Sequence, residues 1–155
     1  MLMENYQIDK IKVAIRPVPY NLHVIKCIVY SKNIDYGIRS ILAIDTGAYC
    51  TSISGDLADK LEYRISECDE TIVFDTAGGE EEMYMTTISK ICIPQLQSSV
   101  DIEFENLRIA RCEHFNDRYI DGVIGLDILL KYNIFINFDE CFIELYERSP
   151  KILTP

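Results

Sequence analysis

The sequence predicts an all-β protein built from short strands. Runs of residues that alternate between polar and apolar, or that are rich in Ile and Val, recur along the chain, and turn-forming residues separate them at close spacing. The strand–helix–strand rhythm that builds parallel α/β sheets does not occur. Only two segments have helical spacing, so we expect a closed or sandwiched β architecture with one or two short helices.

The first half of the sequence contains four predicted strands and one helix. The segment Lys10–Arg16 alternates in polarity, and Pro17–Pro19 ends that run. Further strands are expected at 20–30, 36–44 and 51–53. Residues 54–61 have helical spacing, and Ser54 is the expected N-cap because its hydroxyl can accept from a free amide of the first turn.

The second half is predicted to contain three hairpins. Their strands are 71–74 with 83–93, 100–104 with 107–112, and 133–138 with 141–146. A glycine-tipped segment, Asp75–Gly79, joins the first pair, and polar residues at 105–106 and 139–140 join the other two. Gly122–Gly125 is apolar and ends on glycine, and Leu126–Tyr132 fits a second short helix.

Length and charge limit the possible functions. At 155 residues the chain can form one domain with a hydrophobic core. We expect residues 1–155 to be that domain, with a core at about 10–147 and a short tail at 148–155. The net charge of −10 argues against nucleic acid as a partner, which needs clustered Lys and Arg, and against docking on anionic membranes.

The six cysteines predict neither a metal site nor a cofactor. None forms a Cys-x-x-Cys pair, and no histidine stands at ligand spacing. The N-terminus does not read as a signal peptide, and no apolar run approaches the roughly 18 residues that span a bilayer. We therefore expect reduced, buried thiols and a cytoplasmic protein, with disulfides after an unrecognised export as the alternative. The frequent Ile, Lys, Asn and Tyr residues resemble the usage of an AT-rich bacterium.

The segment Ile41–Ala48 is the strongest candidate for a functional site. Four apolar residues lead to Asp45, which enters a tight turn made by Thr46, Gly47 and Ala48. Gly47 allows a close approach of a second backbone, and the Thr46 hydroxyl can both donate and accept a hydrogen bond. The plain alternative is a turn aspartate whose carboxylate binds local amides, as such residues often do.

Three features follow one another in a characteristic order. They are the Asp45–Ala48 turn, the glycine-tipped hairpin of Asp75, Thr76, Ala77, Gly78 and Gly79, and the apolar segment of Val123, Ile124 and Gly125 before a short helix. This order resembles the retropepsin-like aspartyl protease family over about residues 20–146. The resemblance implies a single-lobed acid protease barrel, a catalytic Asp45, a hairpin flap that closes over substrate, and a crossing segment beside the catalytic turn.

One carboxylate rarely serves as both general acid and general base, so a second aspartate is needed. Asp75–Gly78 resembles a second motif, but it lacks glycine in the third place and is better interpreted as the flap. The resemblance therefore implies a symmetric homodimer with one Asp45 in each copy. One carboxylate would activate water and the other, protonated, would polarise the carbonyl of an extended peptide or protein substrate. The alternative is a non-catalytic peptide-binding or structural homodimer of the same fold.

Overall fold

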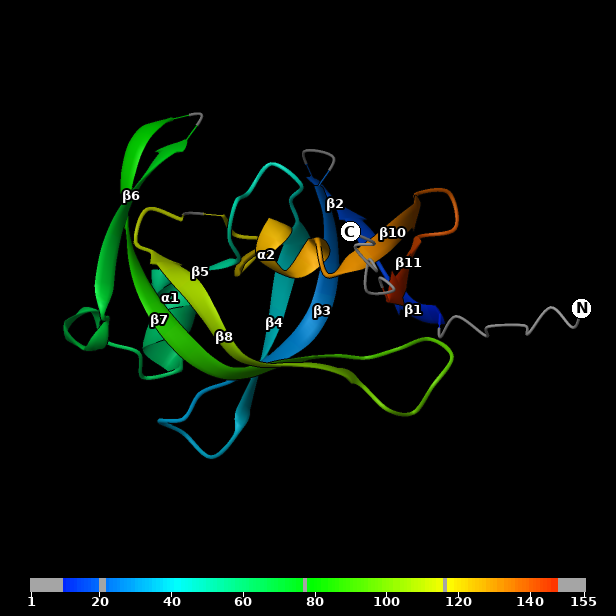
Figure 1. The fold of residues 1–155 in the computed structure, drawn as a ribbon, viewed down its shortest axis with the longest axis horizontal. Helices are drawn as coiled ribbons and strands as arrows, with labels where there is room; N and C mark the ends of the chain where they lie inside the picture. Colours follow the sequence, from blue (N-terminus) through cyan, green and yellow to red (C-terminus); the bar gives the residue numbers. More distant parts are fainter. Residues whose placement is uncertain (1–9, 20–21, 77, 116, 148–155) are drawn as a thin grey trace, which may run out of the picture.

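The computed structural model describes residues 10–19, 22–76, 78–115 and 117–147, and these form two β-sheets with short helices between the strands (Figure 1). The strands are β1 Lys10–Ala14, β2 Arg16–Val18, β3 Leu22–Tyr30, β4 Gly37–Ile44, β5 Ser52–Ser54, β6 Glu70–Thr76, β7 Gly79–Ile93, β8 Ile102–Cys112, β9 Gly122–Ile124, β10 Tyr132–Asn137 and β11 Phe142–Glu147. The helices are α1 Gly55–Lys60, the 3₁₀ turn η2 Ile65–Glu67, and α2 Leu126–Leu129. The predicted all-β fold class with short helices is confirmed, and Ala77 of the predicted flap lies outside the described residues.

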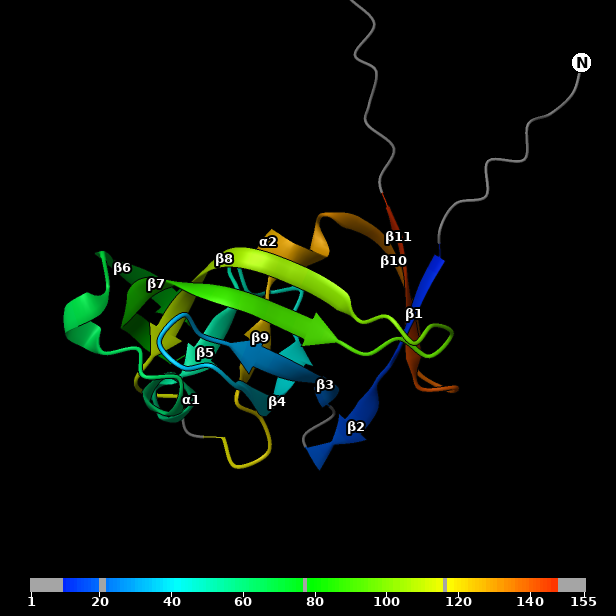
Figure 2. The same ribbon diagram turned by 90° about the horizontal axis from the view of Figure 1, so that it is seen from below.

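The larger sheet is closed by an additional pairing between two of its strands. Its strand order is β2-β3-β4-β9-β5-β8-β7-β6, and an additional pairing of β3 with β7 joins strands from its two halves. The strands from β3 to β7 in that order therefore form a closed cycle of hydrogen-bonded neighbours, with β2 and β6 outside it. Figure 2 shows the long strands β7 and β8 running together across the molecule, from α1 at one end to the smaller sheet at the other.

Strand β9 lies between β4, which leads into the Asp45 turn, and β5, which follows it. It pairs in parallel with β4, where Ile44 lies opposite Ile124, and antiparallel with β5, where Ser52 lies opposite Val123. The start of β9 is anchored by Asp121, whose Oδ2 accepts a hydrogen bond from the Ile41 amide at 2.8 Å. The apolar segment ending on glycine is thus a central strand, which explains why both of its faces are apolar.

Two predicted hairpins are confirmed. The first joins β6 to β7 and is closed at Thr76, whose hydroxyl donates to the Gly79 carbonyl at 2.7 Å. Gly79 has φ of +115°, a conformation that side-chain-bearing residues rarely adopt. The second hairpin joins β10 to β11, and β1 pairs with the other side of β11 to complete a three-stranded sheet.

The predicted hairpin at Glu105–Asn106 is wrong. Residues 102–112 form one strand, β8, which pairs with β7 along its length in a constant register. Asn106 has φ of +50° and lies between the pairs Ile88–Leu107 and Lys90–Glu105, so the polar dipeptide makes a local distortion within the strand. The chain reverses earlier, between Ile93 and Ile102, where Pro94 cannot donate to a ladder.

The single strand predicted over Lys10–Arg16 is also wrong. The chain passes from one sheet to the other at Ile15, so that β1 pairs with β11 and β2 pairs with β3. Pro17 lies inside β2 and does not end it, because β2 is an edge strand whose outer side needs no amide donor. The predicted second helix is shorter than expected, since it ends at Leu129 and Tyr132 already belongs to β10.

The helix α1 is held on the larger sheet by a buried arginine. Ser54 caps the helix as predicted, accepting from the Leu57 amide at 3.1 Å, and Leu57 is buried. Arg111 of β8 is only 4% exposed, and its guanidinium pairs with Asp59 of α1 and with Glu113. Pairing on two sides offsets the cost of burying this charge.

We expect acid to loosen the strand β1. Glu144 of β11 accepts from Lys10 of β1 and from the Tyr146 hydroxyl, and these contacts, the Lys10 contact first, lower the pKa of the Glu144 carboxyl. A lowered folded-state pKa contributes stability above the unfolded value of about 4.3, and this stability is lost as the pH falls through the folded value. The protection factors of the β1 amides, which correct for the slower intrinsic exchange in acid, should therefore fall between about pH 5 and pH 3.

In the variant Glu144→Gln, β1 should exchange faster at neutral pH and should lose most of that acid dependence. Glu140→Gln, in the exposed turn before β11, is the control and should behave like the unmodified protein. An unchanged acid response in Glu144→Gln would contradict the assignment.

Candidate active site

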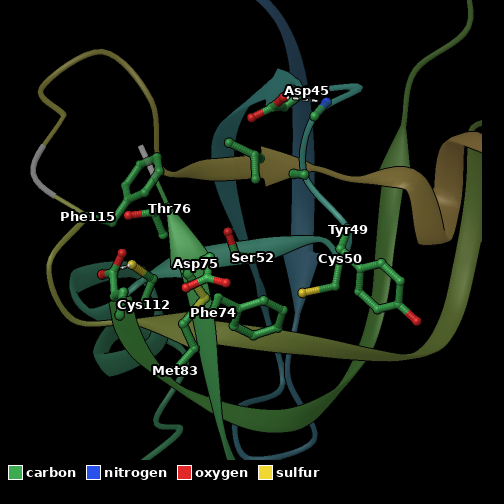
Figure 3. Close-up of a pocket in the computed structure, with 14 residues that line it drawn as sticks. Asp45, Tyr49, Cys50, Ser52, Phe74, Asp75, Thr76, Met83, Cys112 and Phe115 are labelled. Atoms are coloured by element: carbon green, nitrogen blue, oxygen red, sulfur yellow. Dashed lines mark hydrogen bonds between the residues drawn. The ribbon is translucent and has the colours of Figure 1, made fainter. Parts of the chain in front are cut away.

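The turn after β4 presents the Asp45 carboxylate at the surface of the chain. The Asp45 amide donates to the Ile124 carbonyl of β9 at 3.1 Å, so the crossing strand fixes the start of the turn. Within the turn, the Gly47 amide donates to Asp45 Oδ1 at 2.8 Å (Figure 3). Among the described residues, Asp45 Oδ2 has no hydrogen-bond partner. The alternative interpretation, in which the carboxylate only binds amides of its own turn, therefore accounts for one carboxylate oxygen. The other oxygen is open to solvent or a ligand.

Gly125 brings β9 against the backbone that leaves the turn. A Cβ on Gly125 would lie 2.5 Å from the carbonyl carbon of Cys50 and 2.9 Å from the amide nitrogen of Thr51, distances that no real side chain occupies. The Gly125 amide donates to the Thr51 hydroxyl at 3.1 Å, and this hydroxyl donates to Asp127 Oδ1 at 2.8 Å. Asp127 thus has a structural role, because its carboxylate links α2 to the exit of the Asp45 turn.

A cleft of about 470 Å³ lies between the Asp45 turn and the β6–β7 hairpin. The predicted site residues that line it are Asp45, Gly47, Ala48, Asp75, Thr76 and Val123. Figure 3 shows Asp45 at one end of the cleft, with Asp75 and Thr76 approaching from the hairpin. Segments that are far apart in the sequence therefore meet around one opening.

Other predicted site residues support this cleft without lining it. Thr46 lies in the exposed turn, Ile124 is buried under it and accepts the Asp45 amide, and Gly125 lies behind Cys50. Gly78 and Gly79 form the exposed tip of the hairpin, outside the cleft walls.

Sequence reasoning did not predict the remaining side chains that line the cleft. These are Tyr49, Cys50, Ser52, Phe74, Glu81, Met83, Cys112 and Phe115. Phe74, Glu81 and Met83 could have been found from the two-residue period of a hairpin once its register was known.

The cysteines in the cleft are poor nucleophiles. Burial, followed by the hydrogen bond to Glu81, raises the pKa of the Cys112 thiol to about 12. Burial likewise raises the pKa of Cys50. Because the thiolate is the reactive form, the cleft does not favour cysteine chemistry.

The described residues contain no group of three or more metal-ligating side chains. In the same part of the chain, none of the helices has the length and apolar character needed to cross a bilayer.

The fold and the cleft together indicate a class of protein. A turn aspartate beside a crossing apolar strand, facing a hairpin across a cleft, is the arrangement expected of a single-lobed acid protease. The sequence profile of the aspartyl protease family matches residues 34–128, more than half of the chain. The chain belongs to the aspartyl protease family.

One solved structure supports the fold, and a second match is weaker. The crystal structure of a retropepsin-like aspartic protease from Rickettsia conorii superposes with a TM-score of 0.62 at 20% sequence identity, covering 91% of this chain and 92% of that one. The retroviral protease-like domain of Ddi1 from Leishmania major matches with a TM-score of 0.44 and 16% identity, over 84% of this chain and 96% of that one. A search of curated proteins found no significant match.

Proposed function

We propose that the protein is an aspartic endopeptidase that works as a homodimer. Two copies would bring together two Asp45 carboxylates, and the pair would hydrolyse a peptide bond with an activated water. The observation that carries the proposal is the cleft shared by Asp45, Val123 and the hairpin residues Asp75 and Thr76. Membership of the aspartyl protease family supports the same reaction class.

The chemistry follows from two carboxylates that share one proton. Because like charges close together cannot both ionise cheaply, one carboxylate stays protonated beside an ionised one. The ionised Asp45 would take a proton from water, and the protonated one would donate to the carbonyl oxygen of the substrate. The resulting tetrahedral diol would break down as a proton passes to the leaving nitrogen, without a covalent intermediate.

A second copy is supported by what the single chain leaves exposed. Asp45 and Thr46 are exposed, and the neighbouring Tyr49 is 79% exposed. A large aromatic side chain beside a catalytic turn is the kind of residue that protein interfaces cover. We further propose that the chain is one domain and acts on extended peptide or protein segments in the cytoplasm, under the hairpin as a flap.

Dilution of the purified protein tests the dimer. We expect a dimer by sedimentation at high concentration, and a peptidase activity per subunit that falls when dilution separates the copies. The fall should coincide with the dissociation seen by sedimentation, because each copy alone has one of the two carboxylates. A protein that is monomeric at every concentration, or whose activity per subunit does not change as it dissociates, would contradict the proposal.

A further inference from the structure

The cleft contains two carboxylates besides Asp45. Asp75 and Glu81 line it, and its described walls include no Lys, Arg or His. The proposed reaction needs only Asp45, so it gives these two charges no role. Glu81 is the more informative of the two, because the hairpin register fixes its position and its carboxylate has a hydrogen-bond partner.

The register of the hairpin separates Glu81 from the acidic residues beside it. Glu81 pairs with Phe74, and both line the cleft. Glu80 and Glu82, which are adjacent to Glu81 in the strand, do not line the cleft. Glu82 pairs with Val73, which is 60% exposed, so this pair is in solvent. Of the three consecutive glutamates, only Glu81 faces the cleft.

The surroundings of Glu81 combine a fixed carboxylate with apolar walls. The Cys112 thiol donates to Glu81 Oε1 at 2.8 Å, and the thiol is buried. Phe74, Met83 and Phe115 supply apolar surface in the same cleft. In Figure 3, Cys112 and Met83 lie at the end of the cleft away from Asp45.

The Glu81 carboxylate faces the cleft without a cationic partner among the described residues. It forms no ion pair with any Lys or Arg among the described residues, and it is half-buried. A carboxylate that has lost part of its hydration gains more from a cation than one on an open surface. Lys and Arg side chains also carry apolar stems that pack well on aromatic and thioether groups.

We propose that Glu81 selects a Lys or Arg side chain in the substrate, an inference that rests on the proposed peptidase function. The stem of that side chain lies against Phe74, Met83 and Phe115, and its cationic head meets the carboxylate oxygen that Cys112 leaves free. Because Cys112 and Met83 lie at the end of the cleft away from Asp45, the selected side chain lies away from the reacting carboxylate. Glu81 is thus a specificity residue, distinct from the reacting carboxylates.

Peptide binding without turnover tests the proposal. The full chain carrying Asp45→Asn is titrated with a labelled neutral peptide in which one position at a time is Lys, norleucine or Glu. Norleucine keeps the stem and removes the charge. At the position that reaches Glu81, we expect Lys to bind roughly tenfold more tightly than norleucine, and Glu to bind most weakly. The preference should shrink as salt is raised.

Two variants separate a direct contact from a general effect of charge. Glu81→Gln should reduce the Lys-to-norleucine ratio to about one, whereas Glu82→Gln, which removes the same charge from the outer face, should keep it. Equal ratios in the two variants would overturn the proposal. So would the absence of a Lys preference in the protein with Glu81 intact, a measurement that does not depend on how Glu81→Gln folds.

The same experiment keeps the two proposals apart. A wild-type protein that binds the Lys peptide through Glu81 but cleaves none of the set would count against the peptidase and support the subsite. A wild-type protein that cleaves neutral and basic peptides equally well would support the peptidase and overturn the subsite.

Discussion

Replacing Asp45 by Asn should abolish peptidase activity and leave the fold unchanged. An amide cannot take a proton from water, and general acid–base catalysis contributes about 10²–10⁴-fold to such reactions. We expect kcat to fall by at least about 10³-fold, because the substitution removes both carboxylates of the proposed dimeric site. The Asn side chain keeps an oxygen in the place of Oδ1, so the 2.8 Å hydrogen bond from Gly47 can persist. Asp139→Asn, in the exposed turn after β10, is the control and should be fully active.

Mixing the two proteins gives a sharper test of the shared site. If each active site needs Asp45 from both copies, only dimers of two unmodified subunits are active. Equal amounts of wild type and Asp45→Asn, allowed to exchange subunits, should then have about one quarter of the activity of the same total amount of wild type. One half would indicate that each Asp45 acts alone, and full activity of Asp45→Asn would exclude this residue from the reaction.

Local patterns in the sequence predicted the elements that position Asp45. An apolar run followed by Asp, Thr and Gly indicated a strand ending in a tight turn, and β4 ends at Ile44. The cap at Ser54 and the hairpin tip at Gly79 were predicted because each depends on a few adjacent residues. The family resemblance then placed these elements around one cleft, where Asp45, Val123 and Thr76 are found.

The elements that sequence reasoning missed depend on distant partners. Nothing local separates β1 from β2 at Ile15, since the division follows from pairing with β11 and with β3. Glu105–Asn106 has turn chemistry, yet pairing with β7 keeps β8 continuous through it. The inward direction of Glu81 likewise depends on the hairpin register, because a shift by one residue would exchange the two faces. In each of these cases, pairing with a distant strand determined the structure, and the local sequence did not predict it.

Replacing Gly125 by Ala should strongly destabilise the framework around Asp45. The new methyl group would meet backbone atoms of Cys50 at 2.5 and 2.6 Å and the Thr51 nitrogen at 2.9 Å. Backbone cannot move aside as a flexible side chain does, so we expect a loss of about 3 kcal/mol or more in the free energy of unfolding. For a chain of this size, that corresponds to a fall in Tm of roughly 6–12 °C.

The position of the clash also predicts a loss of activity in the molecules that remain folded. Pushing β9 away from Cys50 would disturb the hydrogen bond from Asp45 to Ile124 and the link from Gly125 to Thr51, which together hold the turn. The matched control is Gly78→Ala, whose methyl group would meet, among the described residues, only the Thr76 hydroxyl, at 3.7 Å. Its Tm should stay within a degree or two of wild type, because surface changes usually alter stability by less than about 0.5 kcal/mol. If calorimetry finds the two glycine variants equally stable, close packing of β9 against the turn is not what holds Asp45 in place.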